Sequence, residues 1–180
     1  DHSRAATIGL QKIFELNNSN FLFSWEWTQM EQTSSRVIRD AGSWYHHSAV
    51  THGFTNRGEV LGSSIGPGSN SHYISFSKLK EKSKLGLSLE IIDQNNDFLI
   101  YAFENAKDYR RYWKDYNLHL FYTKRFKNLW SHLNIVYSRS LNYQWGLDES
   151  GQGEGYDYIK PGIDENNFFI KLNFTYFLNF

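Results

Sequence analysis

The 180-residue chain contains no cysteine and only two prolines. Without cysteine it can form neither a disulfide framework nor a thiolate metal site. Its 19 basic and 19 acidic residues cancel, so no overall charge attracts nucleic acid. No apolar run approaches the roughly 18 residues that a membrane-spanning helix needs. With a mean hydropathy of −0.59, these absences alone are typical of a soluble protein.

Aromatic residues, in contrast, make up 18% of the chain, and many stand at every second position. The clearest case is the final segment, residues 170–180, in which polar Lys171, Asn173, Thr175 and Asn179 alternate with apolar residues. The apolar positions are Ile170, Leu172, Phe174, Tyr176, Leu178 and Phe180. A strand of about ten residues with one apolar and one polar face fits the wall of a transmembrane β-barrel. The last strand of a soluble β-sandwich is the alternative.

The same alternation predicts six further strands, which makes the chain one all-β unit over residues 1–180. The predicted strands are residues 5–16, 21–28, 71–79, 85–91, 116–123 and 129–145. Their connections alternate strictly between short and long. The short ones fall at 17–20, 80–83 and 125–128, and the long ones at 31–70, 94–115 and 146–165. Because outer-membrane barrels have short periplasmic turns and longer extracellular loops, we expect an antiparallel transmembrane β-barrel with its long loops outside the cell.

Seven predicted strands are an odd number, whereas single-chain bacterial barrels usually have an even number. An open sheet also leaves two unpaired edges in lipid, where each unsatisfied backbone group costs several kcal/mol. We therefore expect residues 1–180 to be the carboxy-terminal part of a larger barrel, or to pair their edges with another chain.

The longest predicted loop carries the most specific motifs. A Trp-Tyr-x-His block at Trp44–His47 precedes Gly-Phe-Thr-x-Arg-Gly-x-x-Leu-Gly at residues 53–62, and Gly-Pro-Gly-Ser follows at 66–69. The strand residues 87–90 and Asn-Asn-Asp at 95–97 continue the pattern, and an aromatic strand closes it at 168–180. In order and spacing this resembles the Wzi-type capsule assembly proteins, although members of that family are much longer and residues 98–166 match in topology only.

The resemblance implies a non-enzymatic barrel in the bacterial outer membrane that binds or organises capsular polysaccharide through long extracellular loops. Aromatic faces stack on sugars, and Arg57 can engage a uronate carboxylate through its planar fork. The candidate polysaccharide-binding residues are Trp44, Tyr45, His46, His47, Phe54, Asn56, Arg57, Arg110 and Trp113. Alternatively, the loop aromatics fold down into the barrel mouth and Arg57 pairs with an internal carboxylate such as Glu59.

Outward-facing aromatic residues are candidates for membrane-interface anchors. They are Trp25, Trp27, Tyr143, Trp145, Tyr176 and Phe180. The opposite, polar face of the strands either pairs across a filled interior or lines a water-filled path. Its residues include Glu26, Glu90, His119, His132, Asn134 and Lys171, and we expect the two glutamates to lie near basic side chains.

Catalytic and metal motifs are weak. Residues 62–66 match the Gly-x-Ser-x-Gly nucleophile elbow, but no helix is predicted after them. His46, His47 and His52 lack a spacing that would fix a third metal ligand. We predict no catalytic residue, metal or cofactor. The expected partners are outer-membrane lipid and surface polysaccharide, and not nucleic acid. A structural subunit that binds other outer-membrane proteins, or an outer-membrane hydrolase, remains as an alternative.

Overall fold

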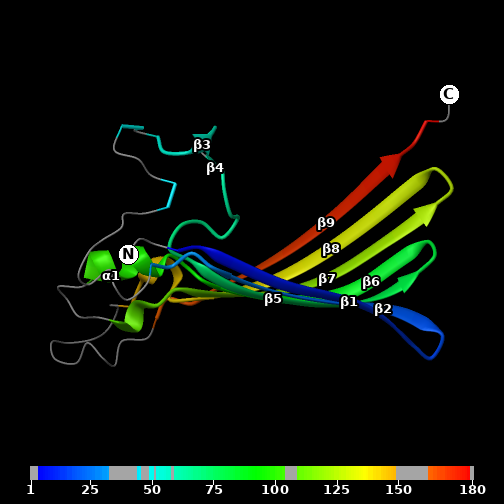
Figure 1. Ribbon diagram of the computed structural model, residues 1–180, viewed down its shortest axis with the longest axis horizontal. Coiled ribbons are helices and arrows are strands. Elements are labelled where there is room, and N and C mark those ends of the chain that lie inside the picture. Colours follow the sequence, from blue (N-terminus) through cyan, green and yellow to red (C-terminus); the bar gives the residue numbers. More distant parts are fainter. Residues whose placement is uncertain are drawn as a thin grey trace.

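The computed structural model describes residues 4–32, 44–45, 49–50, 52–57, 59–103, 109–148 and 162–178. Seven strands form one antiparallel sheet in the order β1-β2-β5-β6-β7-β8-β9 (Figure 1). They are β1 (Ala6–Leu16), β2 (Ser19–Gln29), β5 (Asn70–Lys80), β6 (Ser83–Asp93), β7 (Lys114–Phe126), β8 (Leu129–Leu141) and β9 (Glu165–Tyr176). The prediction of an all-β antiparallel fold with seven long strands is confirmed.

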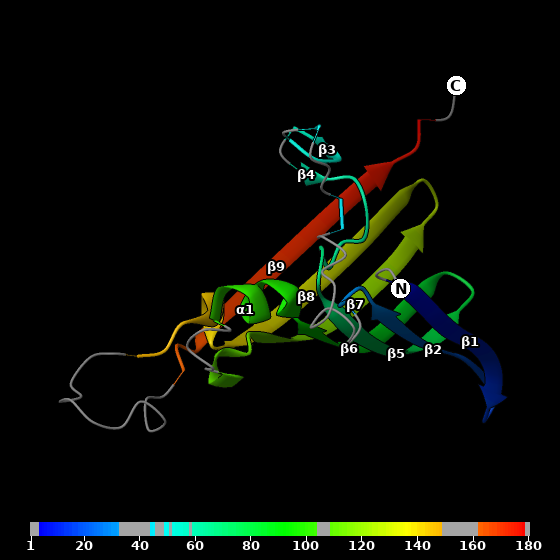
Figure 2. The same ribbon diagram turned by 60° about the vertical axis from the view of Figure 1, so that its left-hand side comes forward.

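The sheet is open among the described residues, because β1 and β9 form its two edges and do not pair with each other. Figure 2 shows the twist of the sheet, with β1 and β9 far apart at opposite sides. All six neighbouring pairs are antiparallel, so β1 and β9 run in the same direction. These seven strands therefore do not by themselves make a closed barrel.

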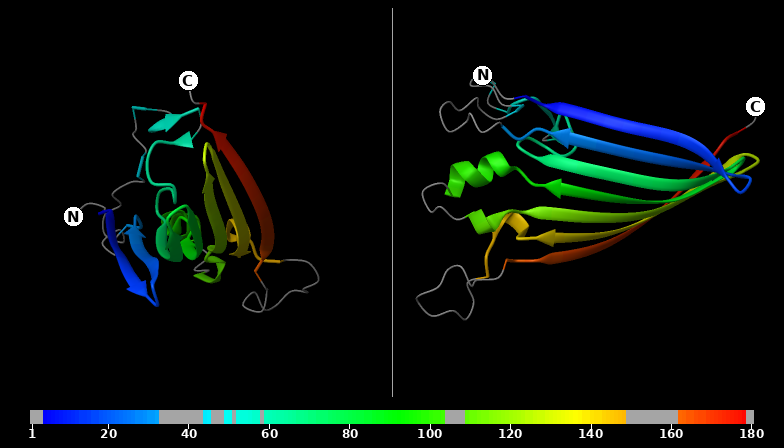
Figure 3. Two further views of the ribbon diagram at one scale, coloured as in Figure 1. Left: turned by 90° about the vertical axis from the view of Figure 1, so that its right-hand side faces the viewer. Right: turned by 60° about the horizontal axis from the view of Figure 1, so that its bottom comes forward.

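Short turns gather at one end of the sheet and long connections at the other (Figure 1, Figure 3). Two-residue turns join β1 to β2, β5 to β6 and β7 to β8. In the first, Asn17 and Asn18 have φ of 48° and 56°, which is the backbone of a type I′ turn and one that asparagine tolerates. We call the end of the sheet with the three two-residue turns the hairpin end. We call the opposite end the loop end; it carries the connections between residues 29 and 70, 93 and 114, and 141 and 165.

Direct cross-strand neighbours lie on one face of a sheet, so the register defines rows that cross all seven strands. Three consecutive rows on one face are apolar except for a lysine in two of them. The Leu89 row comprises Leu10, Trp25, Ile74, Leu89, Leu118, Tyr137 and Phe168. The Leu87 row comprises Lys12, Phe23, Phe76, Leu87, Leu120, Ile135 and Ile170. The Leu85 row comprises Phe14, Phe21, Lys78, Leu85, Tyr122, Leu133 and Leu172.

In the central strands β5, β6 and β7, burial on the two faces is the reverse of what a water-soluble sheet shows, whereas in the edge strands β1 and β9 both faces are exposed. On the apolar face of β6, the exposed fractions of Leu85, Leu87 and Leu89 are 49%, 49% and 39%. Between them on the polar face, Ser88 is only 4% exposed, and Ser77 on the next strand is 1% exposed. The leucines thus face outward while the serines lie under longer side chains of the polar face.

One strand ends earlier than the alternation predicts. β8 stops at Leu141, and the chain enters a short 3-10 turn, η3 (Tyr143–Trp145). Asn142 has φ of 52°, and Gln144 and Trp145 also have positive φ, which an extended strand cannot accommodate. The predicted extension of this strand to residue 145 is therefore wrong.

Several small elements in the long connections were not predicted from the sequence. They are the two-stranded β3 (Thr55–Asn56) and β4 (Glu59–Val60), the helix α1 (Asn96–Phe103) and the 3-10 turn η2 (Tyr109–Arg111). Asn95 begins α1 by accepting a hydrogen bond from the Phe98 N–H at its side-chain Oδ1, at 3.1 Å, as an N-cap residue does. No helix within the described ranges is long and apolar enough to cross a membrane.

Candidate functional site at the loop end

The loop end brings together segments that lie far apart in the sequence. The right-hand view of Figure 3 shows α1, η2 and η3 beside one another beyond the ends of the strands. Two groups of contacts hold these segments in place: a polar network around Glu31 and an aromatic cluster around Trp113. The first contains residues of the 66–69 and 95–97 motifs, and the second contains Trp113, a predicted polysaccharide residue.

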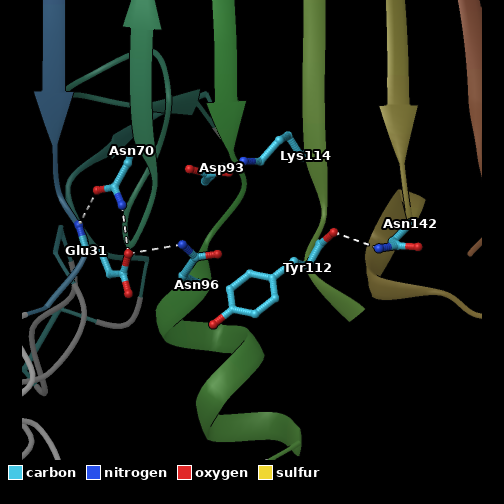
Figure 4. Close-up of polar contacts among 7 residues, drawn as sticks. All are labelled: Glu31, Asn70, Asp93, Asn96, Tyr112, Lys114 and Asn142. Carbon is cyan, nitrogen blue, oxygen red and sulfur yellow. Dashed lines mark hydrogen bonds and ion pairs between the residues drawn. The ribbon is translucent and has the colours of Figure 1, made fainter. Parts of the chain in front are cut away.

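The polar network joins the ends of β2, β5 and β6 (Figure 4). Asn70 donates from Nδ2 to Glu31 Oε2 at 2.7 Å, and Asn96 donates to the same oxygen at 3.0 Å. The Glu31 N–H in turn donates to Asn70 Oδ1 at 3.3 Å. The neighbouring Gln32 N–H donates to both carboxylate oxygens of Asp97, at 3.0 and 3.3 Å. These contacts fix the start of the longest connection against the start of α1.

Two motifs of the family resemblance meet in this network. The Asn96 N–H donates to the Gly68 carbonyl at 2.8 Å, and the Asn95 N–H donates to Ser69 Oγ at 3.0 Å. Gly68 has φ of +66°, and a Cβ there would meet the side chains of Asn95 and Asp97. The Gly-Pro-Gly-Ser and Asn-Asn-Asp motifs are therefore one structural unit, in which Gly68 permits the close approach.

Trp44 and Tyr45 lie against the protein and are only partly exposed. They pack on a small apolar core of Met30, Ile65 and Ile92. The Tyr45 hydroxyl donates to Met30 Sδ at 3.8 Å and accepts from the Ser63 N–H at 3.0 Å. Trp44 and Tyr45 are therefore folded down against the loop end of the sheet, although these seven strands do not close into a barrel mouth.

Phe54, Asn56 and Arg57 lie instead on the small β3–β4 hairpin, which stands away from the sheet in Figure 1. Phe54 is 57% exposed, and Asn56 and Arg57 are exposed as well. The Leu61 N–H donates to the Phe54 carbonyl at 2.8 Å and closes the hairpin. Three of the candidate polysaccharide residues are therefore presented together. His46 and His47 lie outside the described residues.

Trp113 belongs to a second group of aromatic rings. Its ring lies edge-on to Tyr143 and Trp145, with centroids 5.3 and 5.1 Å away, and Phe98 tilts onto Trp145 at 4.5 Å. The Trp113 indole N–H donates to Asp115 at 2.8 Å. We call these four rings the Trp113 cluster. Within the described ranges this cluster makes no hydrogen bond or ring contact with the Phe54 hairpin, so the predicted polysaccharide residues form more than one group.

Hydrogen bonds to backbone atoms join η2 to the chain around η3, beside the Trp113 cluster. Asn142 donates to the carbonyls of Arg110 and Tyr112 at 3.0 and 2.9 Å, and Figure 4 shows the second of these contacts. Arg111 donates to the Trp145 carbonyl at 3.0 Å. The hydrogen bond from Asn142 to the Arg110 carbonyl thus places Arg110 beside the cluster. Lys114 and Asp93 form an ion pair at 2.9 Å nearby, at the loop end of β6 and β7.

The predicted interface aromatics divide into two sets. Trp25, Trp27 and Tyr176 stand on the apolar face of the sheet. Tyr143 and Trp145 are not strand residues on that face, because the chain has already left β8 and their rings pack on Trp113. Phe180 lies outside the described residues.

The predicted polar-face residues do share one face. Glu90 accepts a hydrogen bond from Asn117 at 3.3 Å, and Thr123 and His132 are hydrogen-bonded at 2.8 Å. An open hollow of about 470 Å³ lies over β1, β2 and β5, and both Glu26 and Lys84 line it. Lys84 is therefore a candidate for the basic side chain that we expect near Glu26. Glu90, in contrast, is hydrogen-bonded to the amide of Asn117.

Within the residues that the structure describes, no three His, Asp or Glu side chains gather as a metal site requires. Ser63, in the Gly-x-Ser-x-Gly segment, lies in a turn closed by a hydrogen bond from the Gly66 N–H to its carbonyl at 3.1 Å. No family model, no curated protein and no solved structure matches the chain.

Proposed function

We propose that the seven-stranded sheet is part of the wall of an outer-membrane β-barrel, with its apolar face against lipid and its loop end at the cell surface. The observation that carries this proposal is the reversed burial of the two faces. The three apolar rows cover roughly 700 Å² of sheet, taking about 4.8 Å between strands and about 3.3 Å per residue. Exposed apolar patches of that size mark a surface that contacts lipid or another protein.

The dimensions of the strands fit this environment. Each of the seven has 11 to 13 residues, and a tilted transmembrane strand needs about 9–11. The apolar stretch also begins and ends at different heights in different strands, shifting toward the hairpin end from β1 to β9. In β1 and β2 it includes Ile8 and Trp27, toward the loop end. In β9 the matching position is Asn166, and Phe174 and Tyr176 extend the apolar face toward the hairpin end. A horizontal lipid layer crosses tilted strands in this oblique way.

The loop end supports a role in polysaccharide binding. The β3–β4 hairpin exposes an aromatic ring, an amide and a guanidinium within four residues, from Phe54 to Arg57. These are the groups that stack on sugar rings and bind their hydroxyls or carboxylates. In the Trp113 cluster, Phe98 and Tyr143 remain 42% and 39% exposed. We propose that these two surfaces contact capsular or other surface polysaccharide, without catalysis.

Single-cysteine variants test the orientation, because the native chain has no cysteine. A cysteine at Asn56 should react with a membrane-impermeant maleimide on intact cells. A cysteine at Asn18, in the first hairpin turn, should react only after the outer membrane is permeabilised. Labelling of Asn18→Cys but not Asn56→Cys on intact cells would contradict the proposed orientation.

Polysaccharide binding is tested at the exposed hairpin. The double variant Phe54→Ala/Arg57→Ala should keep its fold and lose retention of purified capsular polysaccharide. Trp44→Ala is a poor probe because Trp44 packs on the Met30 core. Leu61→Ala, on an exposed side chain of the same connection, is the matched control. Equal retention by the double variant and the wild type would remove Phe54 and Arg57 from the binding surface.

The two free sheet edges favour a second candidate function. In it, the chain is a structural subunit whose sheet is completed to a barrel by strands of another chain. About five N–H and five C=O groups of an 11-residue edge strand point away from the sheet. Since β1 and β9 run in the same direction, antiparallel closure requires an odd number of further strands between them. Stable co-purification with another outer-membrane protein, with disulfides formed from cysteines introduced on β1, would select this candidate over a polysaccharide-binding barrel that completes its own wall.

A further inference from the structure

Basic residues concentrate at the hairpin end of the sheet. Seven lie within three residues of one of its three two-residue turns, against only two acidic residues, Glu15 and Glu81. The seven are Lys78, Lys80, Lys82, Lys84, Lys124, Arg125 and Lys127. Since the whole chain has 19 of each sign, this end is basic while the rest, with 12 basic and 17 acidic residues, is acidic. We call the seven the basic rim.

The basic rim directly borders the apolar face. Lys78 occupies the Leu85 row itself, between Phe21 and Leu85. Lys124 lies on the same face one row nearer the turns, opposite Ser83 and Ser131. At β5 and β7 the apolar surface therefore ends in cations on the side of the short turns.

Four of the seven cations lie over aromatic rings. Lys124 Nζ is 4.7 Å from the centre of the Phe126 ring, and Arg125 is 5.6 Å from that of Trp130. Lys84 and Lys78 lie over Phe121 and Phe21 at 5.2 and 5.8 Å. Only Lys78 and Lys124 of these four lie on the apolar face, whereas Lys84 and Arg125, with Phe121 and Trp130, lie on the polar face. For Lys78 and Lys124, an aliphatic stem that follows apolar surface with its charge at the border is the geometry of a side chain at a membrane interface.

No rim cation forms a salt bridge in the described part of the chain, although Lys84 lines the same hollow as Glu26. The salt bridges in that part join Lys114 to Asp93 and Arg139 to Asp164, and both lie at the loop end. Lys80, Lys82, Arg125 and Lys127 are exposed. The rim therefore offers several free positive charges beside a lipid-facing surface.

We infer that the basic rim binds the phosphate headgroups of anionic phospholipids in the membrane leaflet next to the short turns. This inference rests on the proposed function, because it requires the apolar face to lie in a bilayer. Charge complementarity selects the ligand, since a cation held at the headgroup level attracts anionic lipid with about 1 kcal/mol per side chain. A neutral lipid such as phosphatidylcholine offers no such attraction.

Electron spin resonance of labelled lipids tests the inference on the full chain in phosphatidylcholine bilayers. We compare the fraction of spin-labelled phosphatidylglycerol that is immobilised at the protein with that of spin-labelled phosphatidylcholine. The expected result is a preference of about fivefold for phosphatidylglycerol at low salt, from the ~1 kcal/mol per cation above, that declines at high salt.

Two matched variants locate the effect. Lys78→Gln/Lys80→Gln/Lys124→Gln removes the three rim cations of the apolar face and should bring the preference close to one. Lys78→Arg/Lys80→Arg/Lys124→Arg keeps the charges and should retain it. Arg4→Gln, at an exposed loop-end position, should retain it as well.

The possible failures are distinguishable. If neither labelled lipid is immobilised, the apolar face does not contact lipid and the proposed function fails with the inference. If both lipids are immobilised equally by the wild type, only the inference is overturned. An acidic protein partner is then the remaining ligand for the basic rim. A preference that persists in the glutamine variant also overturns it.

Discussion

Replacing Leu87 with arginine distinguishes a lipid-facing sheet from a water-facing one. Leu87 lies in the middle of the three apolar rows, between Phe76 and Leu120, and is 49% exposed. In water, the substitution removes about half of the burial of a leucine, roughly 1 kcal/mol, and leaves the guanidinium solvated. In a bilayer, an arginine on the lipid face of a barrel adds about 2–4 kcal/mol at the midplane. The total expected destabilisation in lipid is thus about 3–5 kcal/mol.

The assay is denaturant unfolding of the chain in lipid vesicles, followed by tryptophan fluorescence. The added 2–4 kcal/mol corresponds to a shift of roughly thirtyfold to several hundredfold in the folding equilibrium, at about 1.4 kcal/mol per tenfold. Leu61→Arg is the matched control, because Leu61 is 61% exposed and lies in a loop-end connection. Its cost should stay below about 1 kcal/mol. Similar costs for the two variants, both near 1 kcal/mol, would refute the placement of Leu87 against lipid.

Two further predictions concern glycines that permit close packing. Gly86→Val should lower the free energy of unfolding by about 1–3 kcal/mol, because its Cβ would lie 2.6 Å from Ser77 Cβ and against the Phe121 ring. The loss should be smaller in the Phe121→Ala background, measured by denaturant titration, and simple additivity would contradict the contact. Gly68→Ala should make the loop end more sensitive to limited proteolysis than Gly66→Ala does. Both glycines have positive φ, but only at Gly68 would the new Cβ collide, with Asn95 and Asp97, so equal sensitivity would contradict a packing role.

Alternation predicts the sheet well because a strand with one apolar face repeats every two residues, whereas an amphipathic helix repeats about every 3.6. It fails at Tyr143 and Trp145, where the spacing continues but the backbone does not. Asn142 adopts a left-handed conformation and turns the chain. A break of this kind depends on contacts such as those of Asn142 with the Arg110 and Tyr112 carbonyls, which no local pattern reveals.

The candidate site was only partly predictable for the same reason. The residue types at Trp44, Phe54 and Arg57 suggest sugar binding equally, yet only the tertiary packing separates Trp44, on the Met30 core, from the exposed hairpin. The helix α1 did have a signal, because Asn95 and Asp97 precede and begin an apolar run as a cap and a first-turn acid do. The polar network around Glu31 joins two connections, residues 30–69 and 94–113, and had no such signal.

The central claim is that the apolar face of the sheet lies against lipid, and a spin-label scan along β6 tests it most directly. Each residue from Leu85 to Glu90 except Gly86, where a Cβ would collide with Phe121 and Ser77, is replaced in turn by cysteine. The cysteine is unique in this cysteine-free chain and is labelled in vesicles. We predict that collision with lipid-soluble oxygen is high at residues 85, 87 and 89 and low at residues 88 and 90. Uniform accessibility along the strand, or greater access of a water-soluble relaxant at residues 85, 87 and 89, would contradict the claim.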